Sequence, residues 1–285
     1  MTAPAAPSGP GREPDDGQGP HAAGLFFLLI FVMTVPFYLI GLTGWRLPGL
    51  PMLPIGALGG VVPMIAAIIL VTRSGGGSAL GMLLGRLFDP ISRAGIAWLS
   101  VAVFLMPAVS LIEYTVLSQT DAALPAISFD ATYALFLFIA FFVGAIGEEL
   151  GWQGYAYPML RRNHTALGAA LIIGVFWAAW HILPYAQLGR GVEWIIWQSL
   201  SAVALRVIII WLFEAAGQRV LIAVVFHAMI NLSWAIFPTQ GSGYDPFIAF
   251  LILAPIAIIA AIVGIPRTSC RAVANSSGPK AGDLQ

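Results

Sequence analysis

Two adjacent glutamates, two histidines and an asparagine are the residues of this sequence best suited to catalysis. Glu148 and Glu149 are neighbours in FFVGAIGEELGWQGY, which is largely apolar on both sides of the pair. His181 lies in the stretch WAAWHILPY, and FHAMINLSW holds His227 and Asn231 four residues apart, on one face of a helix. Ionisable groups inside membrane segments cost at least about 2.5 to 3.5 kcal/mol each, so they usually face a bundle interior and mark function.

These residue types suit the hydrolysis of an amide bond. A carboxylate beside an imidazole in a dry pocket can hold a water molecule and take its proton. A second histidine with an asparagine supplies N–H donors for the oxyanion that forms from a peptide carbonyl. Two histidines and a carboxylate with an open position are also the pattern of a catalytic zinc site. Serine catalysis is disfavoured, because no serine lies in matching surroundings.

Each of these residues also has a structural interpretation, and the residues by themselves leave it open. If the helix ended at Gly147, both glutamates would lie in interfacial water. A lone histidine such as His181 is often a core residue with its hydrogen bonds satisfied. His227 and Asn231 could join helices, since such bonds contribute on the order of 1 kcal/mol in membranes.

The composition requires a membrane around these residues. Hydrophobic residues make up 59% of the 285-residue chain and charged residues 9%, with a mean hydropathy of +0.89. Soluble proteins have about 45 to 50% and about 25%, respectively. The net charge is zero and no basic stripe is present, so we expect no nucleic-acid partner. The single cysteine, Cys270, excludes an internal disulfide framework and a thiolate metal cluster.

Long apolar segments predict an all-α, polytopic transmembrane bundle of about eight spanning helices, because a span needs about 20 apolar residues. We expect a disordered cytoplasmic tail over 1–21, a helical domain over 22–266 with its catalytic core over 131–237, and a second tail over 267–285. A short interfacial helix is expected between Arg73 and Arg93. The predicted spans are 22–44, 52–72, 94–117, 131–155, 165–184, 193–213, 219–237 and 246–265.

Basic residues orient the predicted spans, because Lys and Arg near span ends resist translocation. With the N-terminus inside, only Arg46 and Arg190 lie outside, which predicts both termini in the cytoplasm. Twelve arginines against one lysine, with abundant Ala and Gly, favour a bacterial protein, and so its inner membrane. The cations on the inner side are then Arg12, Arg73, Arg86, Arg93, Arg161, Arg162, Arg219, Arg267, Arg271 and Lys280.

Counting along the helices predicts that the polar residues meet in the cytoplasmic half of the bundle. Glu148 and His181 are about equally far from the turn near His164 that would join their helices. His227 follows Arg219 by eight residues, or roughly 12 Å at the rise of a helix. We therefore expect Glu148, His181, His227 and Asn231 to converge on one cavity that opens toward the cytoplasm.

The three motifs together resemble those of the CPBP intramembrane protease family, also called the ABI or type II CAAX prenyl endopeptidase family. Its motifs are EExxxR, FxxxH and HxxxN or HxxxB. They match Glu148 and Glu149, then Trp177 with His181, then His227 with Asn231, in order, within about residues 131–237.

The resemblance implies a role for each site residue. Glu148 with His181 would activate water, His227 with Asn231 would form the oxyanion hole, and Glu149 would support the site. It implies a peptide or protein substrate at the membrane and, in the glutamate-protease mechanism that we favour, no cofactor; zinc is the alternative.

Two residues depart from the family pattern. Trp177 replaces the Phe of the second motif and preserves an aromatic wall, whereas Gln153 replaces the Arg of the first and removes a cation. Arg206, inside the sixth predicted span, could replace that cation by pairing with Glu149 or Glu148. Alternatively, its long stem could let the guanidinium reach the cytoplasmic interface.

Three classes of function fit the sequence to different degrees. A membrane-embedded endopeptidase is the leading hypothesis. A non-catalytic scaffold or bacteriocin self-immunity protein of the same family is the second, and Gln153 favours it. A proton-coupled transporter is the third, but no inverted repeat or pair of broken helices supports it.

Overall fold

The computed structural model describes residues 20–120, 124–237 and 243–264. The predicted tails fall mainly outside these ranges, although α1 begins at Pro20, two residues inside the first predicted tail. The elements in chain order are α1 (Pro20–Gly41), β1 (Arg46–Leu47), β2 (Leu50–Pro54), the 3-10 helix η1 (Ile55–Val61), α2 (Val62–Gly85), α3 (Arg93–Leu117), α4 (Ala131–Gly151), the π-helix η2 (Trp152–Ala156), α5 (Tyr157–Arg161), α6 (Ala166–Gln187), α7 (Val192–Ala215), α8 (Val220–Ile236) and α9 (Pro246–Val263).

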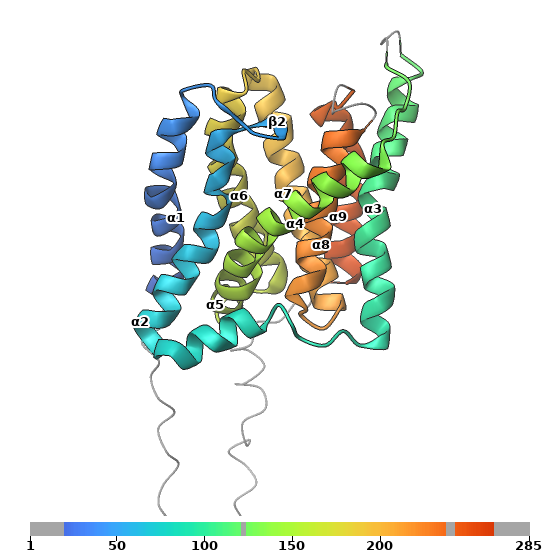
Figure 1. The fold of residues 1–285 in the computed structure, drawn as a ribbon. Helices are drawn as coiled ribbons and strands as arrows, with labels where there is room; N and C mark the ends of the chain where they lie inside the picture. The colour runs from blue at the N-terminus through green and yellow to red at the C-terminus, as the bar shows by residue number, and fades with distance from the viewer. Residues whose placement is uncertain (1–19, 121–123, 238–242, 265–285) are drawn as a thin grey trace, which may run out of the picture.

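The predicted fold class is confirmed, because the described chain is a polytopic helical bundle (Figure 1). Among the described residues, seven helical segments are long and apolar enough to cross a membrane. The remaining predicted span, 219–237, corresponds to α8, which has 17 residues. This is about 25 Å of helix, near the lower limit for a span. The prediction of about eight spans therefore depends on counting α8.

Side chains at the helix starts explain several boundaries. Ser92, Asp130, Thr165 and Asp245 each accept hydrogen bonds from backbone N–H groups in the first turn that follows them, at α3, α4, α6 and α9. Such caps satisfy donors that have no partner inside the helix. The local sequence therefore determines where these four helices begin.

Two local features differ from straight spanning helices. At Gly76, where φ is +61°, α2 breaks and its last part lies across the end of the bundle (Figure 1). This is the short helix that the sequence analysis expects between Arg73 and Arg93, and a glycine permits the break because it has no Cβ. At the other end, β1 and β2 form a small antiparallel hairpin that the sequence analysis does not anticipate.

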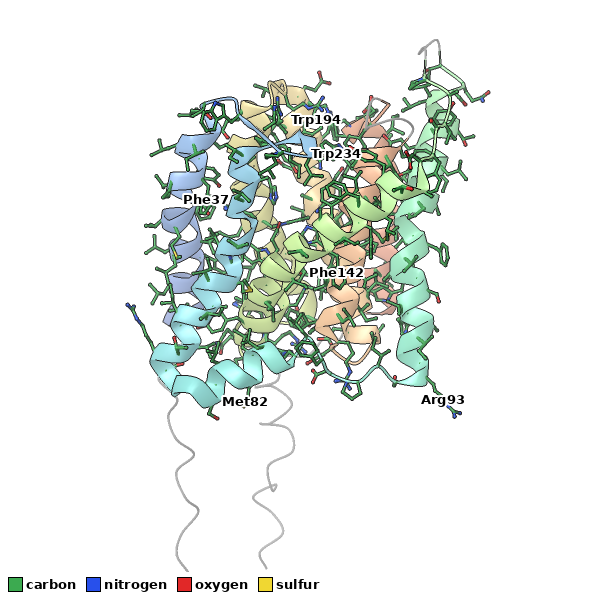
Figure 2. All side chains as sticks on the ribbon, in the orientation of Figure 1. Phe37, Met82, Arg93, Phe142, Trp194 and Trp234 are labelled. Atoms are coloured by element: carbon green, nitrogen blue, oxygen red, sulfur yellow. The ribbon has the colours of Figure 1, made fainter. Side chains whose placement is uncertain are left out.

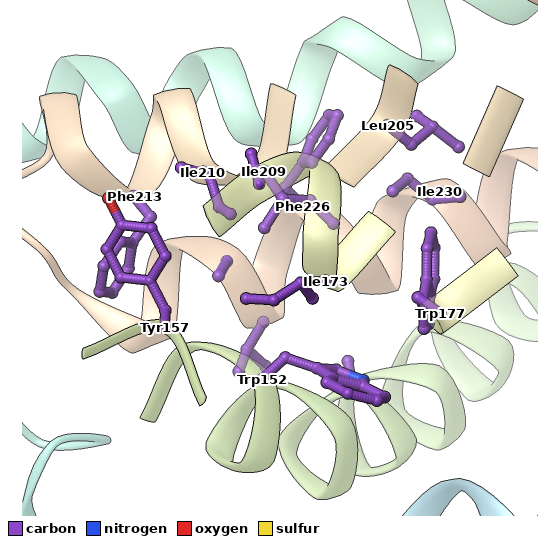
Figure 3. Close-up of a cluster of buried hydrophobic side chains, with 14 of the residues drawn as sticks. Trp152, Tyr157, Ile173, Trp177, Leu205, Ile209, Ile210, Phe213, Phe226 and Ile230 are labelled. Atoms are coloured by element: carbon purple, nitrogen blue, oxygen red, sulfur yellow. The ribbon is translucent and has the colours of Figure 1, made fainter. Parts of the chain in front are cut away.

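The core of the bundle forms around α7 and α8. The first packs mainly against α6 and α9, and the second against α4 and α3, while α4 also contacts α2. Figure 3 shows part of the resulting cluster, in which Trp152 and Trp177 lie near Ile173 and Ile230. Most of α8 is buried, so its polar residues must face other helices.

The two ends of the bundle differ in charge. Arg86, Arg93, Arg161 and Arg219 lie at or beside the ends of α2, α3, α5 and α8, and we call this the arginine end. The opposite end holds the hairpin, and we call it the hairpin end. In Figure 2, Trp194 and Trp234 lie near the hairpin end, whereas Met82 and Arg93 lie at the arginine end.

Candidate active site

The two glutamates lie inside a helical span and not at its end. They are in the last turn of α4, which continues through η2 and α5 to Arg161. The exposed fraction is 8% for Glu148 and 0% for Glu149. The alternative that the span stops at Gly147 is therefore wrong.

The π-helical turn η2 begins at Trp152, three residues after Glu149. Such turns leave backbone groups without regular helical partners and are frequent at functional sites. Arg86 from the arginine end donates from Nη1 to the carbonyl oxygen of Gly154, at 2.7 Å. Burial lowers the pKa of the Arg86 guanidinium, and nearby Asp89 acts against this shift. The arginine thus supplies a hydrogen-bond donor to a carbonyl oxygen of this irregular turn.

Glu148 is held by two tryptophans. The indole Nε1–H of Trp177 donates to Glu148 Oε2 at 2.7 Å, and Trp152 Nε1–H donates a longer bond of 3.4 Å to the same oxygen. The other oxygen, Oε1, lies 3.9 Å from His227 Nε2. One carboxylate oxygen is thus fixed by donors while the other is left for another partner.

Glu149 lies behind this carboxylate in a buried ion pair. Arg206 Nη1 donates to both of its oxygens, at 2.8 and 3.0 Å, and the Arg206 and Glu149 side chains are fully buried. The guanidinium also stacks over the Trp177 ring, 4.4 Å from its centroid. The predicted pairing of Arg206 is confirmed, and the alternative in which it reaches the membrane interface is wrong.

Both histidines use Nδ1 in a structural hydrogen bond. His227 Nδ1 lies 2.7 Å from Glu149 Oε1, and His181 Nδ1 lies 2.8 Å from the carbonyl oxygen of Trp177. A carbonyl or an ionised carboxylate can only accept, so both Nδ1 atoms carry hydrogen. This leaves Nε2 of each ring as the position for proton exchange.

One cavity of about 420 Å³ collects the predicted residues. Glu148, His181, His227 and Asn231 all line it, from α4, α6 and α8, and Glu149 supports His227 from behind. Most of the remaining wall is apolar or aromatic. Three wall residues, Leu58, Val61 and Val143, are also 51%, 36% and 62% exposed on the outside of the bundle.

The position of the cavity differs from the sequence-based expectation. It extends toward the hairpin end, because Leu47, Leu50 and Leu53 of β1 and β2 also line it. His181 lies six residues before the end of α6 at Gln187 but fifteen after its start at Ala166. The cavity therefore extends away from the arginine end, whereas the sequence analysis expected it on the side of these arginines. Counting residues assumes parallel helices of equal depth, and tilted helices do not satisfy that assumption.

Glycines allow the wall of the cavity to approach Glu148. A Cβ on Gly147 would lie 2.9 Å from the backbone oxygen of Gly60, and one on Gly151 would lie 2.5 Å from the backbone of Pro63. A Cβ on Gly60 would lie 3.8 Å from Glu148 Oε1. The backbone of η1 and α2 therefore packs directly on α4 beside the reactive carboxylate.

Two features of the site do not follow from the sequence analysis, namely the donor role of Trp177 and the position of Glu113. Trp177 is more than the aromatic wall that the motif predicts, because its N–H, which Phe lacks, donates to Glu148. Gln153, at the position of the family's arginine, is fully buried, and its amide has no hydrogen-bond partner among the described residues. Glu113 in α3 is buried and lines the cavity, although the sequence analysis does not include it in the site. An acidic residue inside a predicted span is the signal that could have revealed it.

A metal would need donors that are grouped around one point. Glu148 with Nε2 of His181 and His227 supplies a suitable set of donor types. Within the described ranges, however, no three His, Cys, Asp or Glu side chains are close enough together to hold an ion. The residues as arranged therefore do not fit a zinc site.

Comparison with known proteins connects this site to a family. Residues 130–233, which run from the cap of α4 to α8, match the sequence profile described as "Type II CAAX prenyl endopeptidase Rce1-like". These residues are therefore similar to an Rce1-like domain. The Rce1-like match covers all five predicted site residues.

A curated relative is similar over more of the chain. The protein is 27% identical over 232 residues to CAAX prenyl protease 2 of Methanococcus maripaludis, an alignment that covers 73% of this chain and 82% of the relative. The resemblance inferred from the motifs is confirmed. This similarity supports an intramembrane endopeptidase in general terms and a peptide or protein substrate in the bilayer environment.

Proposed function

We propose that this protein is a glutamate-type intramembrane endopeptidase. The observation that supports it most directly is the cavity in which Glu148, His181, His227 and Asn231 face a common space inside the bundle. Glu148 presents one oxygen to this space while tryptophan donors hold the other. The substrate is a membrane-associated protein or peptide.

In the first step, Glu148 and His181 activate a water molecule. Nδ1–H of His181 is bound to a carbonyl, so its Nε2 can accept a proton, as can Oε1 of Glu148. The water oxygen attacks the peptide carbonyl carbon as its proton moves to this pair. The same proton then moves to the amide nitrogen as the C–N bond breaks.

The oxyanion that forms in this step is stabilised by Asn231 and His227. Asn231 offers its side-chain N–H₂ from one helical turn beyond His227, on the same face of α8. His227 donates from Nε2 only while its ring carries both protons, since Nδ1–H is directed at Glu149. Arg206 keeps Glu149 in place as the acceptor of that bond.

Hydrolysis of membrane-anchored peptides by purified protein tests this proposal. We expect Glu148→Gln to abolish detectable cleavage, because the amide keeps the shape but cannot take the proton of water. Glu193→Gln is the matched control, since Glu193 is exposed on α7 outside the cavity. Undiminished turnover by Glu148→Gln would refute the glutamate mechanism.

The same assay tests the expectation that no cofactor is needed. We expect activity to survive prolonged chelation and elemental analysis to find no stoichiometric metal. One tightly held zinc per chain, with activity lost on its removal, would favour the metalloprotease alternative.

A non-catalytic scaffold is the second candidate function. The contacts of Glu149 with Arg206 and His227 join α4, α7 and α8, and such bonds would also hold a rigid bundle together. In that case, wild-type protein would cleave no peptide, and Glu148→Gln would leave its function in cells unchanged.

We further propose that the protein lies in the plasma membrane of a bacterial cell with both termini in the cytoplasm. The arginine end then faces the cytoplasm. Because the cavity extends to the hairpin end, its mouth faces away from the cytoplasm. The exposed wall residues Leu58, Val61 and Val143 border the bilayer, so a substrate reaches Glu148 from that face or from within the lipid.

A further inference from the structure

A buried carboxylate in the part of the cavity near the hairpin end has no role in the mechanism above. Glu113 lies near the hairpin end of α3, is 5% exposed and lines the same cavity as Glu148. Its Oε1 accepts the backbone N–H of Asp245 at 2.7 Å. No Lys, Arg or His side chain of the described residues forms an ion pair with it.

The other buried carboxylates have more hydrogen-bond donors or a cation beside them. Of the three acidic side chains that are buried in the described ranges, Glu149 pairs with Arg206, and Glu148 has two indole donors and a nearby histidine. A carboxylate removed from water needs a cation or several donors to offset its desolvation. Glu113 has one donor, and Asp245 nearby adds a second negative charge.

Aromatic rings also line the cavity, and one of them belongs to Tyr244, which precedes Asp245 in the chain. Tyr185, Trp194 and Tyr244 form a chain of ring contacts, with centroids 5.2 and 6.2 Å apart, and all three line the cavity. Aromatic faces attract cations. Arg190, which is not among the residues that line the cavity, makes such a contact, because its guanidinium carbon lies 4.7 Å from the centroid of the Trp194 ring.

We propose that Glu113 and these three aromatic residues form a subsite for a positively charged group of the substrate. The group is an ammonium or guanidinium, supplied by a Lys or Arg side chain or by a free amino terminus. This proposal rests on the proposed endopeptidase function and names its substrate class: peptides with a positive charge on the hairpin-end side of the bond to be cut. Glu113 is a specificity-determining residue and takes no part in proton transfer.

Matched peptides test the subsite. Full-length protein in nanodiscs is given peptides that differ at one position, scanned on each side of the scissile bond, with Lys, norleucine or Glu and with a free or acetylated amino terminus. We expect kcat/KM at one position to be about tenfold or more higher for Lys than for norleucine, mostly through KM. If the amino terminus is the bound group, acetylation will cause this loss instead.

Variants of Glu113 assign the preference to this side chain. Glu113→Gln keeps an acceptor for Asp245 N–H and should reduce the preference to less than about twofold, while Glu113→Lys should favour the Glu peptide. Glu193→Gln, which removes an exposed negative charge at the same end, should keep the full preference. If Glu113→Gln does not fold, the wild-type comparison still decides, since equal rates for the Lys and norleucine peptides would overturn the proposal.

Binding separates this proposal from the proposed function. Fluorescent Lys and norleucine peptides are titrated against Glu148→Gln protein, with and without Glu113→Gln. A Lys preference that disappears with Glu113→Gln supports the subsite even if no peptide is ever cleaved. Cleavage by wild-type protein without any charge preference leaves the protease standing and refutes the subsite.

Discussion

At the scale of single residues, Arg206 is the group on which the order of the site depends. It neutralises Glu149, stacks on Trp177 and thereby fixes both neighbours of Glu148. Glu149 in turn fixes the tautomer of His227. A cation on α7 thus acts on three residues that stand on α4, α6 and α8.

Replacing Arg206 should therefore destabilise the protein and inactivate it. Arg206→Leu leaves Glu149 buried without a cation, which we expect to cost about 3 to 5 kcal/mol of unfolding free energy. Arg206→Lys keeps the charge but loses the planar stack and should be affected less. Thermal unfolding in detergent and peptide cleavage measure both effects.

Arg73→Leu is the control for that comparison, because Arg73 is exposed near the break in α2. It should change the thermal midpoint little. An Arg206→Leu protein as stable and active as the Arg73→Leu protein would show that the ion pair is dispensable.

At the scale of elements, the contact of α4 with η1 and α2 positions Glu148. Glycines at 147 and 151 allow backbone to pack against backbone there. Small residues at such crossings are a common means of bringing membrane helices together. The π-helical turn that follows shifts the register of the side chains beyond Gly151 relative to those before it.

Gly151→Ala should disturb this crossing. The added methyl group would lie 2.5 Å from the backbone of Pro63, which cannot rotate away as a side chain could. We expect a loss of about 1 to 3 kcal/mol in stability and a decrease in cleavage as α4 moves. Chemical unfolding of the purified variant measures the first effect.

Gly144→Ala on the same helix is the stability control. Nothing lies within 4 Å of its added methyl group, and alanine favours a helix over glycine by up to about 1 kcal/mol. It should be as stable as the wild type or slightly more stable. Equal stability of Gly151→Ala and Gly144→Ala would argue against a tight crossing.

At the scale of the whole molecule, the cavity and the arginines lie toward opposite ends. The arginine end includes Arg86 and Arg93, whereas the cavity wall includes the hairpin. Basic residues near span ends favour the cytoplasmic side. The charge distribution and the position of the cavity together predict that the substrate enters from the side of the membrane away from the cytoplasm or from within the lipid.

Cysteine labelling of intact cells tests that orientation. In a Cys270→Ser background, Trp45→Cys beside the hairpin should react with a membrane-impermeant maleimide added outside. Met82→Cys at the arginine end should react only after the membrane has been permeabilised. Both parent side chains are well exposed, at 70% and 67%. The reverse pattern of labelling would overturn the proposed orientation and place the mouth of the cavity in the cytoplasm.

Much of this protein follows from local sequence. Continuous apolar runs predict the spanning helices because a helix satisfies its own backbone inside a membrane, and capping residues mark where several of them start. The residue types and spacing of Glu148, His181, His227 and Asn231 were enough to predict a shared cavity. The cation missing at Gln153 was enough to suggest Arg206 as a partner of the glutamates.

Tertiary structure alone decided where the cavity opens and what surrounds it. Helix tilt, the break at Gly76 and the close packing at Gly151 set the depth of each side chain, and none of these can be obtained by counting residues along a helix. The indole donors of Glu148 and the position of Glu113 in the cavity wall depend on how helices are rotated against one another. That rotation results from packing over the whole bundle, because all the helices are apolar on most of their surface and their sequences do not show which face is turned inward.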